Sequence, residues 1–170
     1  MDFLAEAIVK LRATPEQAAK LARGLMEEQV SWKPAPNVFS VRENIMHLRD
    51  IDVEGYGKRI PLILDENHPV LPDVDGGRLA RERNYNAQAI QPALDDLRSS
   101  RAEIGDRLAG CTDTDLERKA EMEGIGTLDL RRLLELWMQH DAQHLADLAE
   151  LRRAIDAGDS SPRFERHQVA

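Results

Sequence analysis

Two histidines, His140 and His144, interrupt an apolar stripe near the C-terminal end of the sequence. The stripe recurs in steps of three or four residues and consists of Leu133, Trp137, His140, His144, Leu148, Leu151 and Ile155. At this spacing both imidazoles lie on one face of a helix, about 6 Å apart, which is close enough to bind one metal ion together. Buried imidazoles without polar partners would be costly, so each ring needs a hydrogen bond or a metal ion.

A third histidine, His47, lies in the first half of the second predicted helix. It is next to Leu48 and one turn before Ile51, so it lies on or beside the apolar face of that helix. Three histidines from two core-facing helices supply three protein ligands and leave an open position, as in a catalytic zinc-type site. We therefore predict a metal site formed by His47, His140 and His144. The alternative interpretation is that they are hydrogen-bonded core residues.

The other residues with metal or nucleophile chemistry form no comparable pattern. His68 lies in a proline-rich loop and His167 near the C-terminus, and we predict that both are solvated. The single cysteine, Cys111, excludes an intrachain disulfide and is predicted to be structural or incidental. The final histidine pair has zincin spacing, but Asp141 stands where that motif has its glutamate. No glutamate precedes a histidine by three residues, which argues against a di-iron bundle.

The sequence predicts helices that can position these histidines. Residues 2–30 are predicted as helix in one piece or two, and a capping-box pattern at Thr14 either starts a second segment or kinks the first. A second capping box, from Ser40 to Glu43, starts the helix that carries His47 and ends before Asp65.

Two further long helices complete the predicted framework. One begins around Pro92, and the last is capped by Thr127 and spans roughly residues 128–156. The polar stretch at residues 113–126 is a predicted connection. No segment has a convincing period of two, so no strand is predicted.

Length and composition narrow the class of protein. At 170 residues we predict one domain, an all-α four-helix bundle over residues 1–156, followed by a flexible tail at residues 157–170. With 31 acidic against 23 basic residues the net charge is −8, and basic pairs such as Arg152-Arg153 lie among acids, so no nucleic-acid partner is expected. We also expect no membrane partner and a cytoplasmic location, because no signal peptide or apolar span is apparent.

Two stretches around the histidines resemble the DinB-like superfamily. The first stretch is Trp32 to Pro36 followed by Phe39 to Leu48, and the second is Gly126 to Leu128, Leu133-Leu134 and His140 to Leu145. Their order, together with the three histidines, extends the resemblance over roughly residues 3–155.

The resemblance implies an up-down-down-up bundle of the DinB/YfiT-like type with a divalent metal, commonly nickel or zinc, on His47, His140 and His144. It also implies a homodimer acting on a small-molecule substrate that the sequence does not identify. Some relatives are transferases or isomerases that activate a low-molecular-weight thiol, and others are called metal-dependent hydrolases. We therefore expect a metal-dependent thiol transferase or hydrolase. The alternative is a non-catalytic dimeric bundle, either a stress protein or a metal-binding module.

Carboxylates usually orient metal-bound histidines. By spacing, the candidates are Asp50, one turn from His47, and Asp141 or Asp147 near the final pair. Each of them has an alternative interpretation as a solvated surface acid.

Overall fold

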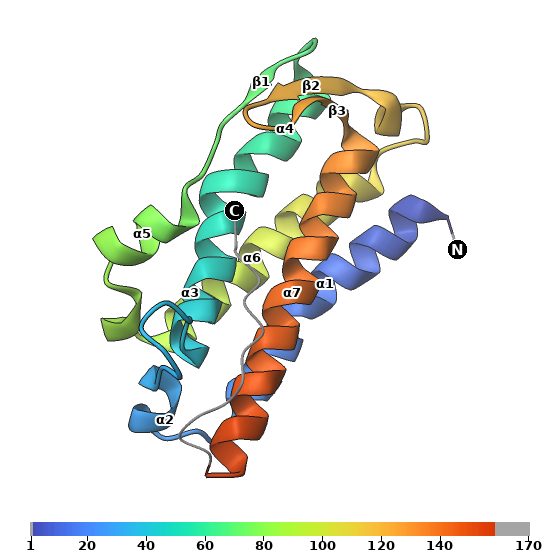
Figure 1. The fold of residues 1–170 in the computed structure, drawn as a ribbon. Coiled ribbons are helices and arrows are strands. Elements are labelled where there is room, and N and C mark those ends of the chain that lie inside the picture. The colour runs from blue at the N-terminus through green and yellow to red at the C-terminus, as the bar shows by residue number, and fades with distance from the viewer. Residues whose placement is uncertain (1, 159–170) are drawn as a thin grey trace.

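Four long helical units form the protein, for which the computed structural model describes residues 2–158 (Figure 1). They are α1 (Phe3–Ala22), α3 (Val41–Asp50) continued by a π-helical turn η1 (Ile51–Tyr56) and α4 (Gly57–Asp65), α6 (Ile90–Ala109) and α7 (Leu130–Asp156). α1 and α7 run in one direction, and α3–α4 and α6 run in the other. The predicted all-α, up-down-down-up bundle is thereby confirmed. α1 and α3 each contact both α6 and α7.

Helix α1 runs through Pro15 in one piece, so of the two alternatives for the pattern at Thr14, the start of a second segment is wrong. A proline inside a helix leaves the carbonyl one turn earlier without its usual donor, because proline has no N–H. Here that carbonyl belongs to Leu11, and the buried Arg101 Nη1 donates a hydrogen bond to it at 3.0 Å. A contact from α6 therefore satisfies the group that Pro15 leaves unpaired. The second helical piece of the predicted 2–30 region is α2 (Glu27–Ser31).

The start of α3 agrees with its predicted capping box. Ser40 Oγ accepts from the backbone N–H of Glu43, and Glu43 accepts from the backbone N–H of Ser40. The backbone widens along η1: the N–H of Gly57, just after this turn, donates to the carbonyl of Asp52, five residues earlier. This π-helical turn leaves both Ile51 and Asp52 buried.

A small sheet closes one end of the bundle and corrects the prediction that the chain has no strands. It contains β1 (Val70–Leu71), β2 (Lys119–Met122) and β3 (Gly126–Asp129) in that order, with β1 parallel and β3 antiparallel to β2. Ala120 and Leu128 face each other across β2 and β3 and are buried. The connection from β2 to β3 contains Gly124 at φ +76°, a conformation that suits glycine.

Helix α7 begins two residues later than predicted. Asp129, and not Thr127, is its N-cap and accepts a hydrogen bond from the Arg132 N–H, because Thr127 belongs to β3. The remaining short elements are α5 (Gly76–Glu82) and two 3-10 turns, η2 (Tyr85–Ala87) and η3 (Asp115–Glu117). No helix within residues 2–158 is long and apolar enough to cross a membrane.

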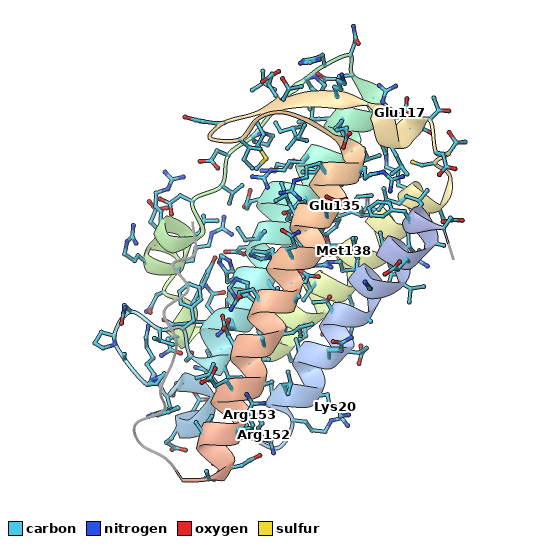
Figure 2. The ribbon with its side chains drawn as sticks, turned by 45° about the vertical axis from the view of Figure 1, so that its right-hand side comes forward. Lys20, Glu117, Glu135, Met138, Arg152 and Arg153 are labelled. Atoms are coloured by element: carbon cyan, nitrogen blue, oxygen red, sulfur yellow. The ribbon has the colours of Figure 1, made fainter. Side chains whose placement is uncertain are left out.

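Charged side chains cover the outward surface of α7, as Figure 2 illustrates for Glu135, Arg152 and Arg153. Arg152 forms an ion pair with Asp156 at 2.9 Å and donates to the carbonyl of Arg23 at 2.8 Å. Arg152 of this basic pair therefore contacts groups of the protein itself, which agrees with the predicted role of the pair on a helical surface. The predicted tail lies outside the described residues apart from residues 157 and 158, as does His167.

Candidate metal centre

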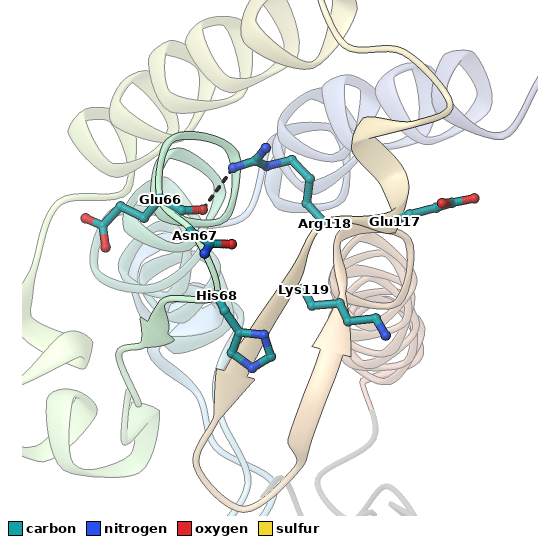
Figure 3. A pocket seen from close by; sticks show the side chains of 6 residues that line it. All are labelled: Glu66, Asn67, His68, Glu117, Arg118 and Lys119. Carbon is teal, nitrogen blue, oxygen red and sulfur yellow. Dashed lines mark hydrogen bonds between the residues drawn. The ribbon is translucent and has the colours of Figure 1, made fainter.

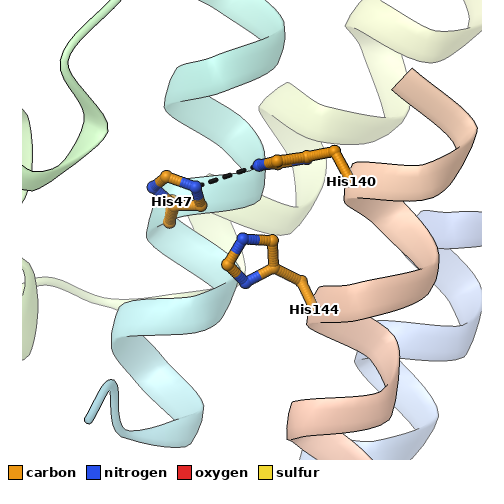
Figure 4. Close-up of side chains that lie close together, drawn as sticks. All are labelled: His47, His140 and His144. Carbon is orange, nitrogen blue, oxygen red and sulfur yellow. Dashed lines mark hydrogen bonds between the residues drawn. The ribbon is translucent and has the colours of Figure 1, made fainter. Parts of the chain in front are cut away.

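The three histidines named from the sequence lie together between α3 and α7 (Figure 4). One ring nitrogen from each of His47, His140 and His144 lies within 4.8 Å of the others. Nε2 of His47 and Nε2 of His140 are 3.0 Å apart, and the ring of His144 is centred 4.5 Å from each of the other two rings. Two nitrogens bound to one tetrahedral zinc ion would lie about 3.3 Å apart, so this spacing suits a shared ion.

The helices explain why the rings meet. His140 and His144 are one turn apart on α7, whose neighbouring positions Trp137 and Leu148 are buried in the core. His47 faces them from α3, which packs against α7. The predicted stripe on α7 thus turns the pair inward, and the capped α3 places the third ring opposite.

Burial keeps the rings of His47 and His144 uncharged. His47 is 2% exposed and His144 is 1% exposed. Burial, reinforced by the neighbouring His140, lowers the pKa of His144 to about 3, and burial with the two facing histidines lowers the pKa of His47 well below its ordinary value. Neutral imidazoles are the form that donates a lone pair to a metal ion.

Several ring nitrogens have no hydrogen bond within the described residues. These atoms are His47 Nδ1, His140 Nδ1 and His144 Nε2, and all are buried. Buried polar groups without a hydrogen bond are rare and call for an explanation, such as an ion. An ion shared with the Nε2 atoms of His47 and His140 would also satisfy Nε2 of His144, so the donor set fits a divalent metal ion.

The cluster leaves room for a further ligand. Within the described residues no Cys, Asp or Glu joins the three histidines, so the protein offers three ligands and not a closed set of four. The His140 side chain is 19% exposed, in contrast to the two buried rings. His140 is therefore the ring of the cluster that contacts solvent most.

Two residues that were not predicted to belong to the site, Phe39 and Gly76, enclose His47. The ring of Phe39 is centred 5.4 Å from the imidazole. Gly76, the first residue of α5, lies so close that a Cβ there would come within 2.3 Å of His47 Cε1 and 2.8 Å of Nδ1. A glycine at position 76 is therefore a steric requirement of the cluster. Nothing in the sequence pattern pairs residue 76 with residue 47.

Replacing Gly76 with alanine is expected to displace the His47 ring and weaken zinc affinity at least about tenfold, the scale for changes next to metal ligands. Gly77→Ala is a matched control, because its Cβ would meet nothing closer than Asp75 Oδ1 at 3.4 Å. Both changes raise helix propensity equally. Titration of each metal-free variant with zinc against a chromophoric chelator measures the difference, and equal affinities would refute the steric role of Gly76.

The predicted carboxylate partners are engaged elsewhere. Asp50 is buried and accepts from Tyr85 Oη at 2.6 Å, with Arg83 Nη1 at 2.9 Å, so it belongs to a separate polar cluster. Asp147 accepts from Gln143 Nε2 at 2.9 Å. The residue that does bond a histidine is Asn44, whose Oδ1 lies 2.8 Å from His144 Nδ1. Asn44 was not predicted, because the usual side-chain partner of a metal-bound histidine is a carboxylate and asparagine has an amide.

Asp141 points away from the histidines into a buried ionic cluster. Its Oδ1 is 3.8 Å from His140 Nδ1, whereas Arg101 donates to it at 2.6 and 2.9 Å and Thr14 donates at 2.6 Å. Asp52 accepts from the same Arg101 at 2.5 and 2.8 Å. Asp141 thus anchors the residue that follows His140.

A hollow separate from the histidine cluster lies at the end of the bundle that carries the sheet (Figure 3). It has a volume of about 300 Å³ and is lined by Glu66, Asn67, His68, Glu117, Arg118 and Lys119. His68 Nε2 lies 2.9 Å from Glu121 Oε1 and the side chain is half-exposed. His68 is therefore outside the histidine cluster, as predicted.

Fold and cluster together define a helical bundle with three histidines on two of its helices. A sequence model of the DinB superfamily matches residues 10–148, and the chain belongs to this superfamily. The chain is 24% identical over 152 residues to uncharacterized protein YuaE of Bacillus subtilis (strain 168), covering 79% of this chain and 90% of that protein. It is similar in structure to YfiT from Bacillus subtilis, described as a probable metal-dependent hydrolase with an unusual four-helix bundle topology. That match has a TM-score of 0.83 at 19% identity and covers 90% of this chain and 87% of YfiT.

Proposed function

We propose that the protein is a metal-dependent enzyme that binds one divalent ion, nickel or zinc, through His47, His140 and His144. The observation that carries the proposal is the set of three inward-facing imidazoles, each with one ring nitrogen within 4.8 Å of the others. The description of YfiT, a protein of the same fold, as a probable metal-dependent hydrolase supports it.

The residues of the chain have distinct tasks in this proposal. His47 and His144 are buried and give the ion two fixed ligands, while His140 stands at the side that solvent reaches. Gly76 and Phe39 limit the movement of His47. Burial keeps His47 and His144 deprotonated, so protons do not compete for their ring nitrogens near neutral pH.

When bound, a divalent ion would supply Lewis acidity and lower the pKa of a coordinated water or thiol. Water as the nucleophile corresponds to a hydrolase, and a low-molecular-weight thiol corresponds to an S-transferase. We place hydrolysis first, because the description of YfiT supports it. Among the described residues, the cluster contains no Asp or Glu that would serve as a general base.

Elemental analysis of untagged protein is the first test. The wild-type protein is expected to hold about one nickel or zinc ion per chain, and His140→Ala to hold almost none, because two ligands bind far more weakly than three. His68→Ala is the matched control, since His68 lies outside the cluster, and should retain the metal. Absence of metal in wild-type protein after incubation with zinc or nickel would overturn the proposal.

The loaded protein then distinguishes the two reactions. Cleavage of ester or amide substrates without added thiol identifies a hydrolase. Consumption of a free thiol in the presence of an electrophile, measured by loss of sulfhydryl groups, identifies a transferase. Either activity must disappear in His140→Ala, and addition of zinc or nickel must not restore it. An activity that persists in His140→Ala does not come from this site.

A further inference from the structure

Asn44 lies on α3 one turn before His47 and is 1% exposed. Its side chain has two contacts. Nδ2 donates a hydrogen bond to the carbonyl of Ser40 at 3.0 Å, and Oδ1 lies 2.8 Å from Nδ1 of His144 on α7. The asparagine therefore joins the start of α3 to one histidine of the cluster.

The first contact fixes the orientation of the Asn44 amide. A carbonyl oxygen can only accept a hydrogen bond, so the amide nitrogen must face Ser40 and the amide oxygen must face His144. Ser40 is held by its own capping box with Glu43, and its Oγ donates to Asn86 Oδ1 at 2.7 Å. The carbonyl that orients Asn44 is thus part of a fixed local structure.

The second contact then determines the protonation of the His144 ring. Because Asn44 Oδ1 only accepts, Nδ1 of His144 must carry the hydrogen. A neutral imidazole has one N–H, so the lone pair of His144 is on Nε2. That nitrogen is buried and has no hydrogen bond within residues 2–158. It is therefore the atom that is free to bind an ion.

His144 differs in this respect from the other two histidines. Nδ1 of His47 and Nδ1 of His140 have no hydrogen-bond partner among the described residues. Their Nε2 atoms lie 3.0 Å from each other, a contact in which either ring can be the donor, so it does not assign a tautomer to either one. Gly76 lies against His47, and Asp141 is 3.8 Å from His140 Nδ1. Among the described residues, His144 is the one histidine of the cluster whose hydrogen-bond partner can only accept, and this hydrogen bond selects one tautomer.

We propose that Asn44 is a positioning residue that holds His144 as the Nδ1–H tautomer and directs its Nε2 into the metal site. The effect on metal affinity rests on the proposed function, whereas the tautomer of His144 does not. A hydrogen bond to the far nitrogen of a ligating histidine fixes ring orientation and raises its basicity. Asn44 is thus the amide counterpart of the carboxylate found beside many metal-bound histidines.

Two substitutions separate the hydrogen bond from the shape of the side chain. Asn44→Leu has a similar volume but no acceptor, and Asn44→Asp keeps an acceptor oxygen. Ser40→Ala is the matched control, because it removes the cap hydroxyl at the same end of α3 and leaves the Ser40 carbonyl and Asn44 in place. Comparison with Ser40→Ala removes any effect of a weakened helix start.

Two measurements follow. In metal-free wild-type protein, ¹⁵N NMR of the histidine side chains should give a protonated Nδ1 and an unprotonated Nε2 for His144, and Asn44→Leu should give a mixture of tautomers. Zinc affinity, measured against a chelator, should fall about 10- to 100-fold in Asn44→Leu, the usual effect of losing such a partner. Asn44→Asp, which keeps the acceptor toward His144 but loses the donor to Ser40, should keep the Nδ1–H tautomer and more zinc affinity than Asn44→Leu. Ser40→Ala should stay close to wild type.

The NMR measurement decides the inference even where the variants do not fold. An Nε2–H tautomer of His144 in the wild-type protein would overturn it, and so would equal zinc affinity in Asn44→Leu and wild type. If wild-type protein binds no metal but His144 has the Nδ1–H tautomer, the proposed function fails and the positioning of His144 by Asn44 stands.

Discussion

Replacing Arg101 with methionine is expected to lower the free energy of unfolding by about 3–5 kcal/mol, the cost of breaking a buried ion pair from one side. Arg101 is 2% exposed and forms bidentate pairs with two buried carboxylates, Asp52 and Asp141. It also stacks on Trp137, with its guanidinium carbon 4.4 Å from the ring centre. The substitution would leave both carboxylates and the Leu11 carbonyl without their donor.

The two carboxylates respond differently to their shared arginine. Burial is the largest influence on Asp52 and raises its pKa to about 6 against the opposing charge of Arg101. Burial also acts on Asp141, but the charge of Arg101, the nearby His140 ring and hydrogen bonds from Arg101 and Thr14 outweigh it and lower that pKa to about 2. Near neutral pH the charge of Arg101 is therefore matched first by Asp141.

Urea unfolding at pH 7 measures the effect of Arg101→Met. The matched control is Arg98→Met, one turn earlier on α6, where the arginine pairs with Glu16 at a partly exposed position and should contribute about 0–1 kcal/mol. Adding Asp52→Asn and Asp141→Asn to Arg101→Met should recover part of the loss, since the unpaired charges disappear. A loss below about 1 kcal/mol in Arg101→Met would refute the account.

Local signals in the sequence were sufficient to predict the helices and the histidine cluster. The capping box at Ser40 marked the start of α3 correctly, because a cap depends on residues that are neighbours in sequence. The spacing of His140 and His144 placed both on one face of α7, and the apolar face around His47 turned it toward the core. These inferences needed helix periodicity and no knowledge of distant contacts.

The remaining features depend on contacts between segments far apart in the chain. Asn44 and His144 are 100 positions apart, and Asp52 and Arg101 are 49 positions apart. The π-helical turn shifts the residues after Ile51 relative to a regular helix, so periodicity alone does not predict that Asp52 is buried. The strands have two to four residues each, which is too short for an alternating pattern to stand out.

Metal-free protein is expected to become less stable between pH 7 and pH 5, and His144 alone should account for about 2 kcal/mol of the loss. Burial, the larger cause, and the neighbouring His140 lower its folded-state pKa to about 3, while in the unfolded chain it titrates near its ordinary value of about 6.5. Below pH 6.5 the unfolded state therefore binds a proton that the folded state does not. Stability from this group is fully present above pH 6.5 and is lost as the pH falls toward 3.

Two other buried groups titrate over the same range. His47 acts in the same direction as His144, because burial and the facing histidines lower its pKa as well. Asp52 acts in the opposite direction: burial raises its pKa to about 6, so the folded state gains a proton first and is stabilised as the pH falls. The total pH dependence is thus a sum of opposing contributions, and a comparison of variants is needed to isolate His144.

Urea unfolding of chelator-treated wild type, His144→Gln and His68→Gln at pH 7 and pH 5 provides this comparison. Asp52 and most of the effect of His47 are common to all three proteins and cancel in the differences. Wild type and His68→Gln, whose substituted residue is half-exposed, should lose about 2 kcal/mol more between the two pH values than His144→Gln. An equal loss in all three proteins would mean that His144 takes up its proton in the folded state. The ring would then titrate in the folded protein near its ordinary pKa of about 6.5, and below that pH its Nε2 would carry a hydrogen where a ligand needs a lone pair.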